Sequence, residues 1–482
     1  MTNILMSSFS RALVPPVATP APTKNWAPGN YIASTTTNND SIWDKNTGLT
    51  KTQGILQRLN SANDPDGHWK GALLRFHWTD LENDLGEYAW DDPAFPGDLT
   101  KQLGMPKVAR YLAQIGALPG RRLMVFIQLK TANPTGTTTD PADFVHAVPQ
   151  YMRDSATYSD GEDYYATRDG TTYQGSYNGE YAFESSNGGP GGFVPNMHVA
   201  AVRVRFEALM QAFADYFNDN PYLEAICFSE AAIAEPIGST GKASETVNGV
   251  VITRPNTDSN PTTGVGGWHS NSTWFTQMTT GFTTARAALS NVQISQWINA
   301  DRADMKTFAP NIVAAGIGLG MTDLCPEEKG FNYRNDIAGQ ETASPGNIQH
   351  CQDAGGLTIV TGHASRPSLV GTVVGRCQEA GTIQGQAHVY PDYPGLGTSR
   401  QDVHDFAVNT VGVTHLLWAH NTGNQDATGA IDAQIPASCR DTSDAYTAYG
   451  DYGGRGLNTV TDEWIHDAGS TITTVTTRPT GW

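Results

Sequence analysis

Hydrophobic positions along the chain follow two different periods. Nearly continuous apolar runs such as Gly71–His77 and Arg122–Leu129 predict buried strands. The stretch His198–Phe217 instead predicts a helix, because its apolar residues recur every three or four positions. These residues are Phe206, Leu209, Met210, Phe213 and Phe217. Strands and helices that alternate in this way indicate βα units around a parallel sheet.

Eight strands are expected along the chain, with helices between most of them. The strands are Asn30–Ser34, Gly71–His77, Arg122–Leu129, Leu223–Glu230, Val292–Ile298, Ile317–Met321, Thr382–Tyr390 and Thr414–His420. The helices are Thr52–Ala62, Pro106–Leu118, His198–Phe217, Ser272–Leu289, Asp304–Ala315, Ser368–Ala380 and Ser399–Val411. This order predicts an α/β fold, a (β/α)8 TIM barrel.

Several stretches stand outside the βα pattern. Residues 1–25 contain too much proline for a helix and no apolar run of signal-peptide length, so we expect a stiff Pro-rich N-terminal arm. The loops Thr131–Pro195 and Ala231–Ser270 are long, and long loops in compact domains are usually functional. We assign residues 26–425 to the barrel and 426–482 to an irregular extension that covers it.

Composition narrows the classes of partner. Only 16% of the residues are charged, and 30 Lys and Arg stand against 48 Asp and Glu, a net charge of -18. This charge disfavours nucleic acid and anionic lipid head groups. No apolar run is long enough for a transmembrane helix, so membrane insertion is not expected. A surface of Gly, Thr, Ser and Asn indicates an extracellular or virion-associated protein, which the N-terminal arm could attach to a larger assembly.

The cysteines do not form a metal-binding pattern. None of the five has CxxC spacing, which argues against structural zinc, and their odd number leaves at least one thiol free within the chain. One or two bridges remain open among Cys325, Cys351, Cys377 and Cys439. Two glycine-rich stretches, Gly188–Gly192 and Gly316–Gly320, lack the spacing of a dinucleotide loop, so no cofactor is expected.

Two segments carry a family resemblance. The second predicted strand ends in Arg75-Phe-His-Trp78 and continues through Leu81-Glu82, Gly86, Tyr88 and Trp90. This pattern resembles the segment after the second strand in clan A glycoside hydrolases, which include β-galactosidase-like and cellulase-like enzymes. The segment Tyr216-Phe-Asn-Asp-Asn-Pro-Tyr222, followed by a strand that ends in Ser229-Glu230, resembles a second motif of the same clan.

The resemblance implies roles for particular residues. The glutamate that ends strand four is the clan's general acid/base, so this role falls on Glu230. An asparagine that contacts a sugar hydroxyl precedes it in the clan, and Ser229 stands in its place here. We interpret Glu82 as structural, because in the motif it packs near the loop.

The clan's nucleophile, a glutamate at the end of strand seven, has no counterpart in the expected place. Gln386 occupies that position, and an amide can neither form a glycosyl ester nor activate water as a carboxylate does. Three explanations stay open: an engineered Glu-to-Gln change, a natural non-catalytic relative, or another carboxylate. The candidates for that carboxylate are Asp392, Asp323 and Glu235.

Sugar binding needs flat aromatic faces and polar groups near the strand ends. We expect the aromatic faces from Trp78, Tyr390 and Trp418, and the polar groups from Arg75, His77, Ser229, His388 and Asn421. His77 and His388 could instead be metal ligands, but the His-x-His pair of metal-dependent hydrolases is absent, so no metal is expected.

The sequence therefore predicts a glycoside hydrolase that acts on a polysaccharide or oligosaccharide by a retaining, two-carboxylate mechanism, with Glu230 as acid/base and Gln386 at the nucleophile position. The alternative is a non-catalytic carbohydrate-binding or virion/surface structural protein that keeps the barrel without the chemistry.

Overall fold

The computed structural model describes residues 25, 27, 29–34, 51–60, 64, 69–88, 105–131, 145–168, 171–182, 193–197, 199–228, 244–247, 250–253, 271–298, 311–312, 315, 317–321, 369–373, 415–420, 464–468 and 471–475. Among the helices within these ranges, none is long and apolar enough to cross a membrane.

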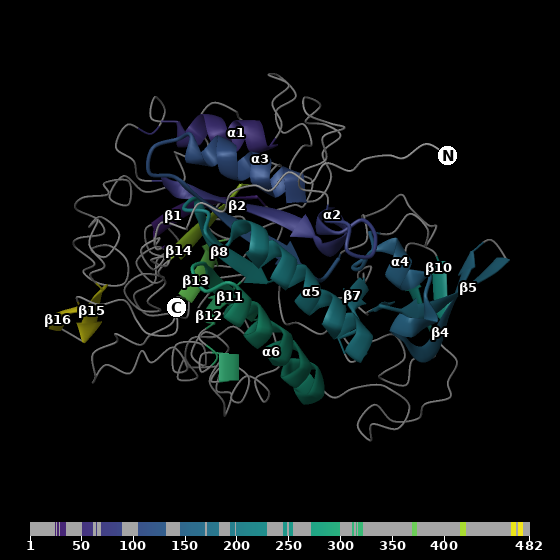
Figure 1. Ribbon diagram of the computed structural model, residues 1–482. Coiled ribbons are helices and arrows are strands. Elements are labelled where there is room, and N and C mark those ends of the chain that lie inside the picture. The colour runs from purple at the N-terminus through teal and green to yellow at the C-terminus, as the bar shows by residue number, and fades with distance from the viewer. Residues whose placement is uncertain are drawn as a thin grey trace, which may run out of the picture.

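Eight parallel strands form a closed ring (Figure 1). In ring order these strands are β1 (Gly29–Ser34), β2 (Trp69–His77), β3 (Arg122–Gln128), β8 (Leu223–Phe228), β11 (Gln293–Ile298), β12 (Gly318–Met321), β13 (Leu369–Val373) and β14 (His415–His420). The ring closes where β14 pairs with β1, from Gly29 opposite His415 to Ser34 opposite His420. Ring order follows chain order, which is the arrangement that successive βα units produce.

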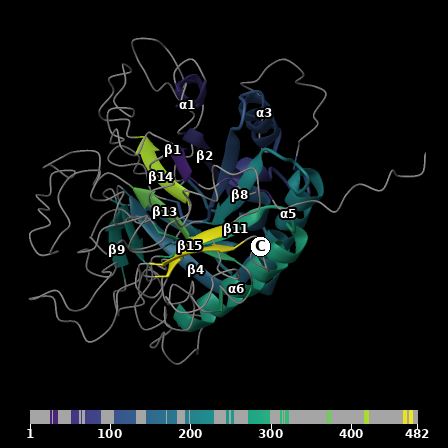
Figure 2. The ribbon, with the colours of Figure 1, turned by 90° about the vertical axis from the view of Figure 1, so that its left-hand side faces the viewer.

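Helices follow the first four ring strands. They are α1 (Lys51–Leu59), α3 (Met105–Gly116), α5 (Ala200–Phe217) and α6 (Asn271–Ala288). Figure 2 shows α5 and α6 outside β8 and β11, so the sheet is covered there by a helical layer. After β11 the described residues include only two helical positions, Asn311 and Ile312. The α/β architecture is thus established for half of the ring.

Within the described residues, the expected strands and helices agree with the structure except around the seventh strand. All the other expected strands overlap ring strands. Four expected helices overlap described helices: Thr52–Ala62, Pro106–Leu118, His198–Phe217 and Ser272–Leu289. The helix expected over Ser368–Ala380 is wrong, because β13 occupies Leu369–Val373. Its sequence Leu-Val-Gly-Thr-Val is rich in β-branched residues, which favour strands over helices. The strand expected over Thr382–Tyr390, the helix Ser399–Val411 and most of Asp304–Ala315 lie outside the described residues.

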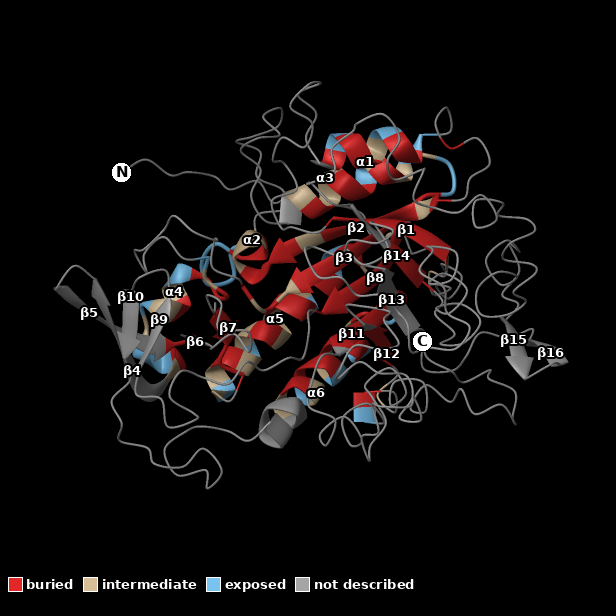
Figure 3. Ribbon diagram, turned by 180° about the vertical axis from the view of Figure 1, so that it is seen from behind, coloured by how far each residue is buried: buried red, intermediate tan, exposed pale blue. Residues whose placement is uncertain are grey.

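The ring strands are mostly buried where their burial is described (Figure 3), and their apolar side chains form two clusters. Leu74 and Phe76 belong to the core between strands and helices, whereas Leu73 belongs to a second cluster formed by residues of the ring strands alone. This inner cluster is Tyr31, Ala33, Leu73, Met124, Phe126, Ala225, Cys227, Trp297 and Leu417. Because both faces are buried, these strands are continuous apolar runs rather than alternating ones.

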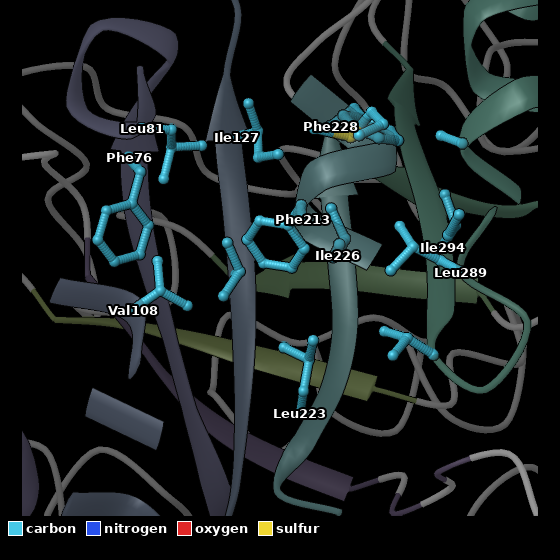
Figure 4. Close-up of a cluster of buried hydrophobic side chains, with 14 of the residues drawn as sticks. Phe76, Leu81, Val108, Ile127, Phe213, Leu223, Ile226, Phe228, Leu289 and Ile294 are labelled. Atoms are coloured by element: carbon cyan, nitrogen blue, oxygen red, sulfur yellow. The ribbon is translucent and has the colours of Figure 1, made fainter. Parts of the chain in front are cut away.

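The apolar stripe of α5 is confirmed. All five residues that predicted it are buried, and Phe213 lies close to Ile226 of β8 in the outer core (Figure 4). The Phe206 ring packs edge-on against Phe228 and Phe282, which stack on each other with centroids 4.4 Å apart. Each fully buried phenylalanine contributes about 1.5–3 kcal/mol.

The two long loops are joined to each other. The first contains α4 (Gln150–Arg153), a 3-10 turn (Ala156–Tyr158), β4 (Ser159–Arg168), β5 (Thr171–Asn178), β6 (Glu180–Ala182) and β7 (Phe193–Pro195), and the second contains β9 (Ser244–Val247) and β10 (Val250–Thr253). β10 pairs antiparallel with β4, which makes one four-stranded sheet in the order β5-β4-β10-β9. Figure 1 shows this sheet beyond the carboxyl end of β2. In the C-terminal extension, β15 (Trp464–Ala468) and β16 (Thr471–Val475) form a hairpin.

Candidate functional site

The carboxyl end of β2 leads directly into a short helix. β2 ends at His77, and α2 (Trp78–Leu81) begins at the next residue. The His77 backbone N–H donates to the Asp80 carboxylate over 2.7 Å, which fixes the first turn of α2. The strand therefore turns sharply, and the residues after it fold back onto the barrel.

Glu82, directly after α2, is the centre of a buried hydrogen-bond network. Its carboxylate accepts from the Trp78 indole N–H at 2.8 Å, the Tyr151 hydroxyl at 2.9 Å and the Gly86 backbone N–H at 3.2 Å. The Arg205 guanidinium also bonds to it and supplies the opposite charge. The side chain is fully buried, so these partners replace the water that a carboxylate otherwise needs.

The network ties three parts of the chain together. Arg205 comes from α5 and Tyr151 from α4, and the Arg205 guanidinium also donates to the Tyr151 hydroxyl at 2.9 Å and the Tyr88 hydroxyl at 3.1 Å. Burial, followed by the nearby Glu82 charge, raises the pKa of Tyr151, so its hydroxyl stays protonated and donates to the carboxylate. The structural interpretation of Glu82 agrees with this geometry. Nothing in the sequence pattern indicated Tyr151 or Arg205 as its partners.

The placement of Trp78 differs from the role expected for it. The residue is completely buried, its indole N–H is committed to Glu82, and its ring packs edge-on against Phe206 with centroids 5.7 Å apart. No ring face is left for a sugar, because the tryptophan points into the outer core beneath α5. We correct the expectation that Trp78 contacts substrate: in this structure it is a core residue.

Arg75 lies on β2 two residues before its end. Its guanidinium is 4.6 Å from the centre of the Phe126 ring and 5.6 Å from that of Trp297, both residues of the inner cluster. The Nε–H donates to the Ser34 carbonyl, at the last residue of β1, over 2.8 Å. This contact places the cation near the carboxyl ends of the strands, where barrel enzymes bind their ligands.

His77 is the last residue of β2. It is nearly buried, with 9% of its surface exposed. Burial lowers the pKa of His77, the nearby Asp80 carboxylate opposes this shift, and the Arg75 charge adds to it. Arg75 and His77 therefore provide one permanent cation and one imidazole that favours its neutral form at the same strand end.

The second resembling segment is the turn between α5 and β8. The Tyr222 N–H donates to the Asn220 side-chain oxygen at 2.9 Å, and the Leu123 N–H, at the start of β3, donates to the Tyr222 carbonyl at 2.8 Å. Asn25 donates its side-chain amide to the carbonyls of Asn220 and Leu223 at 2.8 and 2.7 Å. This segment therefore organises the amino end of the ring, opposite to the strand ends at which Glu230 is expected.

Most of the remaining expected site residues lie outside the described part of the chain. Trp418 belongs to β14, where its backbone pairs with Ile32 and Val373, and nothing further is described of it. The residues outside are Ser229, Glu230, Gln386, His388, Tyr390 and Asn421.

The expected place of Gln386 needs a correction. The seventh ring strand is β13, which ends at Val373, so Gln386 lies well beyond the end of that strand rather than at it. The strand register therefore gives no support for Gln386 as the replacement of a strand-end nucleophile. Among the described residues, no three His, Cys, Asp or Glu side chains come together as metal ligands.

Comparison with known proteins finds similarity in structure alone. No family model matches the chain, and no curated protein matches it. A β-galactosidase from Marinomonas ef1 aligns with 81% of this chain and 53% of its own, at 9% identity and a TM-score of 0.39. A β-1,4-D-mannanase from Cryptopygus antarcticus aligns with 86% of this chain and 94% of its own, at 8% identity and a TM-score of 0.37.

A hyperthermophilic endocellulase from Pyrococcus horikoshii aligns with 84% of this chain and 85% of its own, at 10% identity and a TM-score of 0.35. This chain thus spans about half the length of the β-galactosidase and most of the length of the other two. The structures to which the chain is similar bear the names of glycoside hydrolases.

Proposed function

We propose that the chain is a (β/α)8 glycoside hydrolase that cleaves a neutral or weakly charged glycan, with Glu230 as its general acid/base. One observation carries this proposal: β8, paired in parallel with β3 and β11, ends at Phe228, so Ser229 and Glu230 follow the carboxyl end of the fourth ring strand. Catalytic residues of such barrels come from the ends of several strands.

The buried strand before Glu230 supports acid/base chemistry at this position. Glu230 follows the fully buried run Ala225-Ile-Cys-Phe228, and an apolar surrounding favours the protonated form of a carboxyl group. Arg75 and His77 are at the end of β2, on the same side of the ring, and offer donors to sugar hydroxyls. A catalytic acid and polar binding groups are two of the parts that glycoside cleavage needs, and the third is a second carboxylate.

The topology also supports a candidate for the second carboxylate. Asp323 follows β12 by two residues, as Glu230 follows β8 by two residues. We propose Asp323 as the nucleophile of a retaining mechanism, in which the two carboxyl groups lie about 5–5.5 Å apart. Gln386 is the competing position, where a glutamate would have to be restored.

The experiment compares four forms of the full chain: wild type, Glu230→Gln, Asp323→Asn and Gln386→Glu. Each is assayed on 4-nitrophenyl β-galactoside, β-glucoside and β-mannoside, and on galactan, hydroxyethyl cellulose and galactomannan. We expect the wild type to cleave at least one substrate, and both carboxylate substitutions to lower kcat by about 1,000-fold or more without changing the melting temperature.

The other outcomes separate the alternatives. Hydrolysis that appears only in Gln386→Glu would assign the nucleophile to that position. Binding of a polysaccharide without turnover in any of the four forms would contradict the enzyme and support a carbohydrate-binding protein.

A further inference from the structure

A histidine and a glutamate of the first long loop form a close pair. The Nδ1 atom of His146 lies 2.5 Å from an Oε1 oxygen of Glu180, the first residue of β6. The His146 side chain is 13% exposed and the Glu180 side chain 6% exposed. The imidazole therefore reaches the surface, whereas the carboxylate behind it is shielded.

The carboxylate of Glu180 has a fixed orientation. Its second oxygen accepts the backbone N–H groups of Ala147 at 2.7 Å and Val148 at 3.3 Å. The preceding residue, Gly179, has a φ of 75°, and a β-carbon there would lie 3.0 Å from Val148 and 3.2 Å from Met152, so a larger residue would be strained. These contacts already attach the loop to β6, which leaves the other oxygen free to hold the imidazole.

The pair belongs to the carboxyl side of the ring. The Thr131 N–H, three residues after β3, donates to the Phe193 carbonyl at 2.9 Å, and the Phe193 N–H donates to the Thr131 hydroxyl at 2.9 Å. Phe193 starts β7, the partner of β6, and its ring lies 5.0 Å from the His146 ring. β3 is the ring neighbour of β8, the strand that precedes Glu230.

The pair fixes the chemistry of the outer ring nitrogen. Nδ1 faces the carboxylate, so Nε2 is the ring nitrogen left for a ligand, and in the Nδ1–H tautomer it is an acceptor. Within the described part of the chain, Glu180 is the polar partner of this imidazole. A sugar hydroxyl is a donor of the matching kind and needs no charge on the ligand.

We propose that His146, held by Glu180, is a substrate-contacting residue that accepts a hydrogen bond from a hydroxyl of the glycan. Phe193 fixes the ring plane, and Glu180 fixes which nitrogen faces the ligand. This inference rests on the proposed function, because that function supplies the glycan.

The experiment removes Nε2 and keeps the contact to Glu180. In His146→Asn the side-chain amide nitrogen takes the place of Nδ1 and still donates to Glu180, but nothing replaces Nε2. We expect the melting temperature to stay within about 1 °C, and KM for the substrate found with the wild type to rise about tenfold, with kcat within about twofold. The second variant, His146→Gln, places an amide oxygen near the Nε2 position and is expected to keep KM within about threefold.

The control is Gln150→Ala, in the same segment, because the Gln150 side chain is exposed and, among the described residues, bonds to Asp154 and Arg153. Gln150→Ala should change neither the melting temperature nor KM. An unchanged KM in His146→Asn would show a purely structural pair and overturn the inference, while wild-type hydrolysis keeps the proposed function. If His146→Asn does not fold, an equally raised KM in His146→Gln and Gln150→Ala would overturn it. A wild type that neither binds nor cleaves any glycan of the panel would instead contradict the proposed function.

Discussion

At the scale of single residues, polar side chains inside the fold decide the geometry near the strand ends. Glu82 is fully buried and has four partners, two from its own segment and two from distant parts of the chain. A buried carboxylate without partners would cost several kcal/mol, so the network is a condition for the loop to fold back as it does. The sequence pattern located Glu82 in a loop, but its partners Tyr151 and Arg205 are far away along the chain.

Glu82→Gln tests this network. The amide places an N–H group among donors and leaves Arg205 without its counter-charge, so we expect the free energy of unfolding to fall by about 3 kcal/mol. Urea unfolding followed by circular dichroism measures it. The matched control is Asp215→Asn on α5, an exposed carboxylate that bonds to Gln211, where the change should stay within about 0.5 kcal/mol. Equal effects in the two variants would refute the stabilising role of the network.

His77 gives stability a pH dependence with a defined sign. Burial lowers its pKa in the folded state, whereas in the unfolded state the pKa returns to about 6.5. The unfolded chain therefore binds the proton more readily, and stability is lost as pH falls through about 6.5 and below. In His77→Gln the loss of unfolding free energy between about pH 7 and pH 5 should be smaller than in the wild type. Urea titrations at both pH values measure the difference, and parallel losses would contradict the expectation.

At the scale of elements, periodicity was informative where one pattern dominated. The stripe on α5 and the runs of β2 and β3 were predicted within a few residues, because burial on one face or on both leaves a clear signal. The signal failed at β13, where a five-residue strand of mixed composition was interpreted as a helix. A short strand in a ring is stabilised mainly by its neighbours β12 and β14, and their contribution does not appear in its own sequence.

The pairing of β2 with β3 depends on a glycine. A β-carbon at Gly71 would lie 1.8 Å from the Arg122 carbonyl oxygen, and this backbone atom cannot move away without breaking the pairing. Gly71→Ala should therefore lower the free energy of unfolding by about 3 kcal/mol or more. The control is Gly120→Asn: φ there is 71°, no atom lies within 4 Å of the added β-carbon, and asparagine tolerates this conformation, so the loss should be about 1 kcal/mol or less. Chemical unfolding measures the free energy of unfolding of both variants, and equal losses in the two would contradict the prediction.

At the scale of the whole molecule, segments distant in sequence are joined to each other at both ends of the ring. At the carboxyl side the two long loops share one sheet through the pairing of β4 with β10. At the amino side Asn25 accepts from the Gln293 side chain through its carbonyl and donates its backbone N–H to Asn291, each at 2.8 Å. A single residue before β1 therefore joins the starts of β8 and β11.

Asn25→Ala tests this closure. The carbonyls of Asn220 and Leu223 would lose their side-chain donor, and we expect a loss of about 2 kcal/mol in the free energy of unfolding. Gln211→Ala, which removes an exposed amide that bonds to Asp215, should change it by less than about 0.5 kcal/mol. Differential scanning calorimetry would show the loss as a lower melting temperature, and an unchanged value in Asn25→Ala would argue against the closure.

Local periodicity and turn residues encode the α/β class, most strands, the α5 stripe and the loop position of Glu82, so these features can be predicted from the amino-acid sequence. The core position of Trp78, the pairing of the two long loops and the contact of His146 with Glu180 emerge only in the folded chain. These contacts join residues that are distant along the chain, and their energies arise only when burial removes water from both partners. No local pattern records such a partner, so it could not be predicted from the sequence.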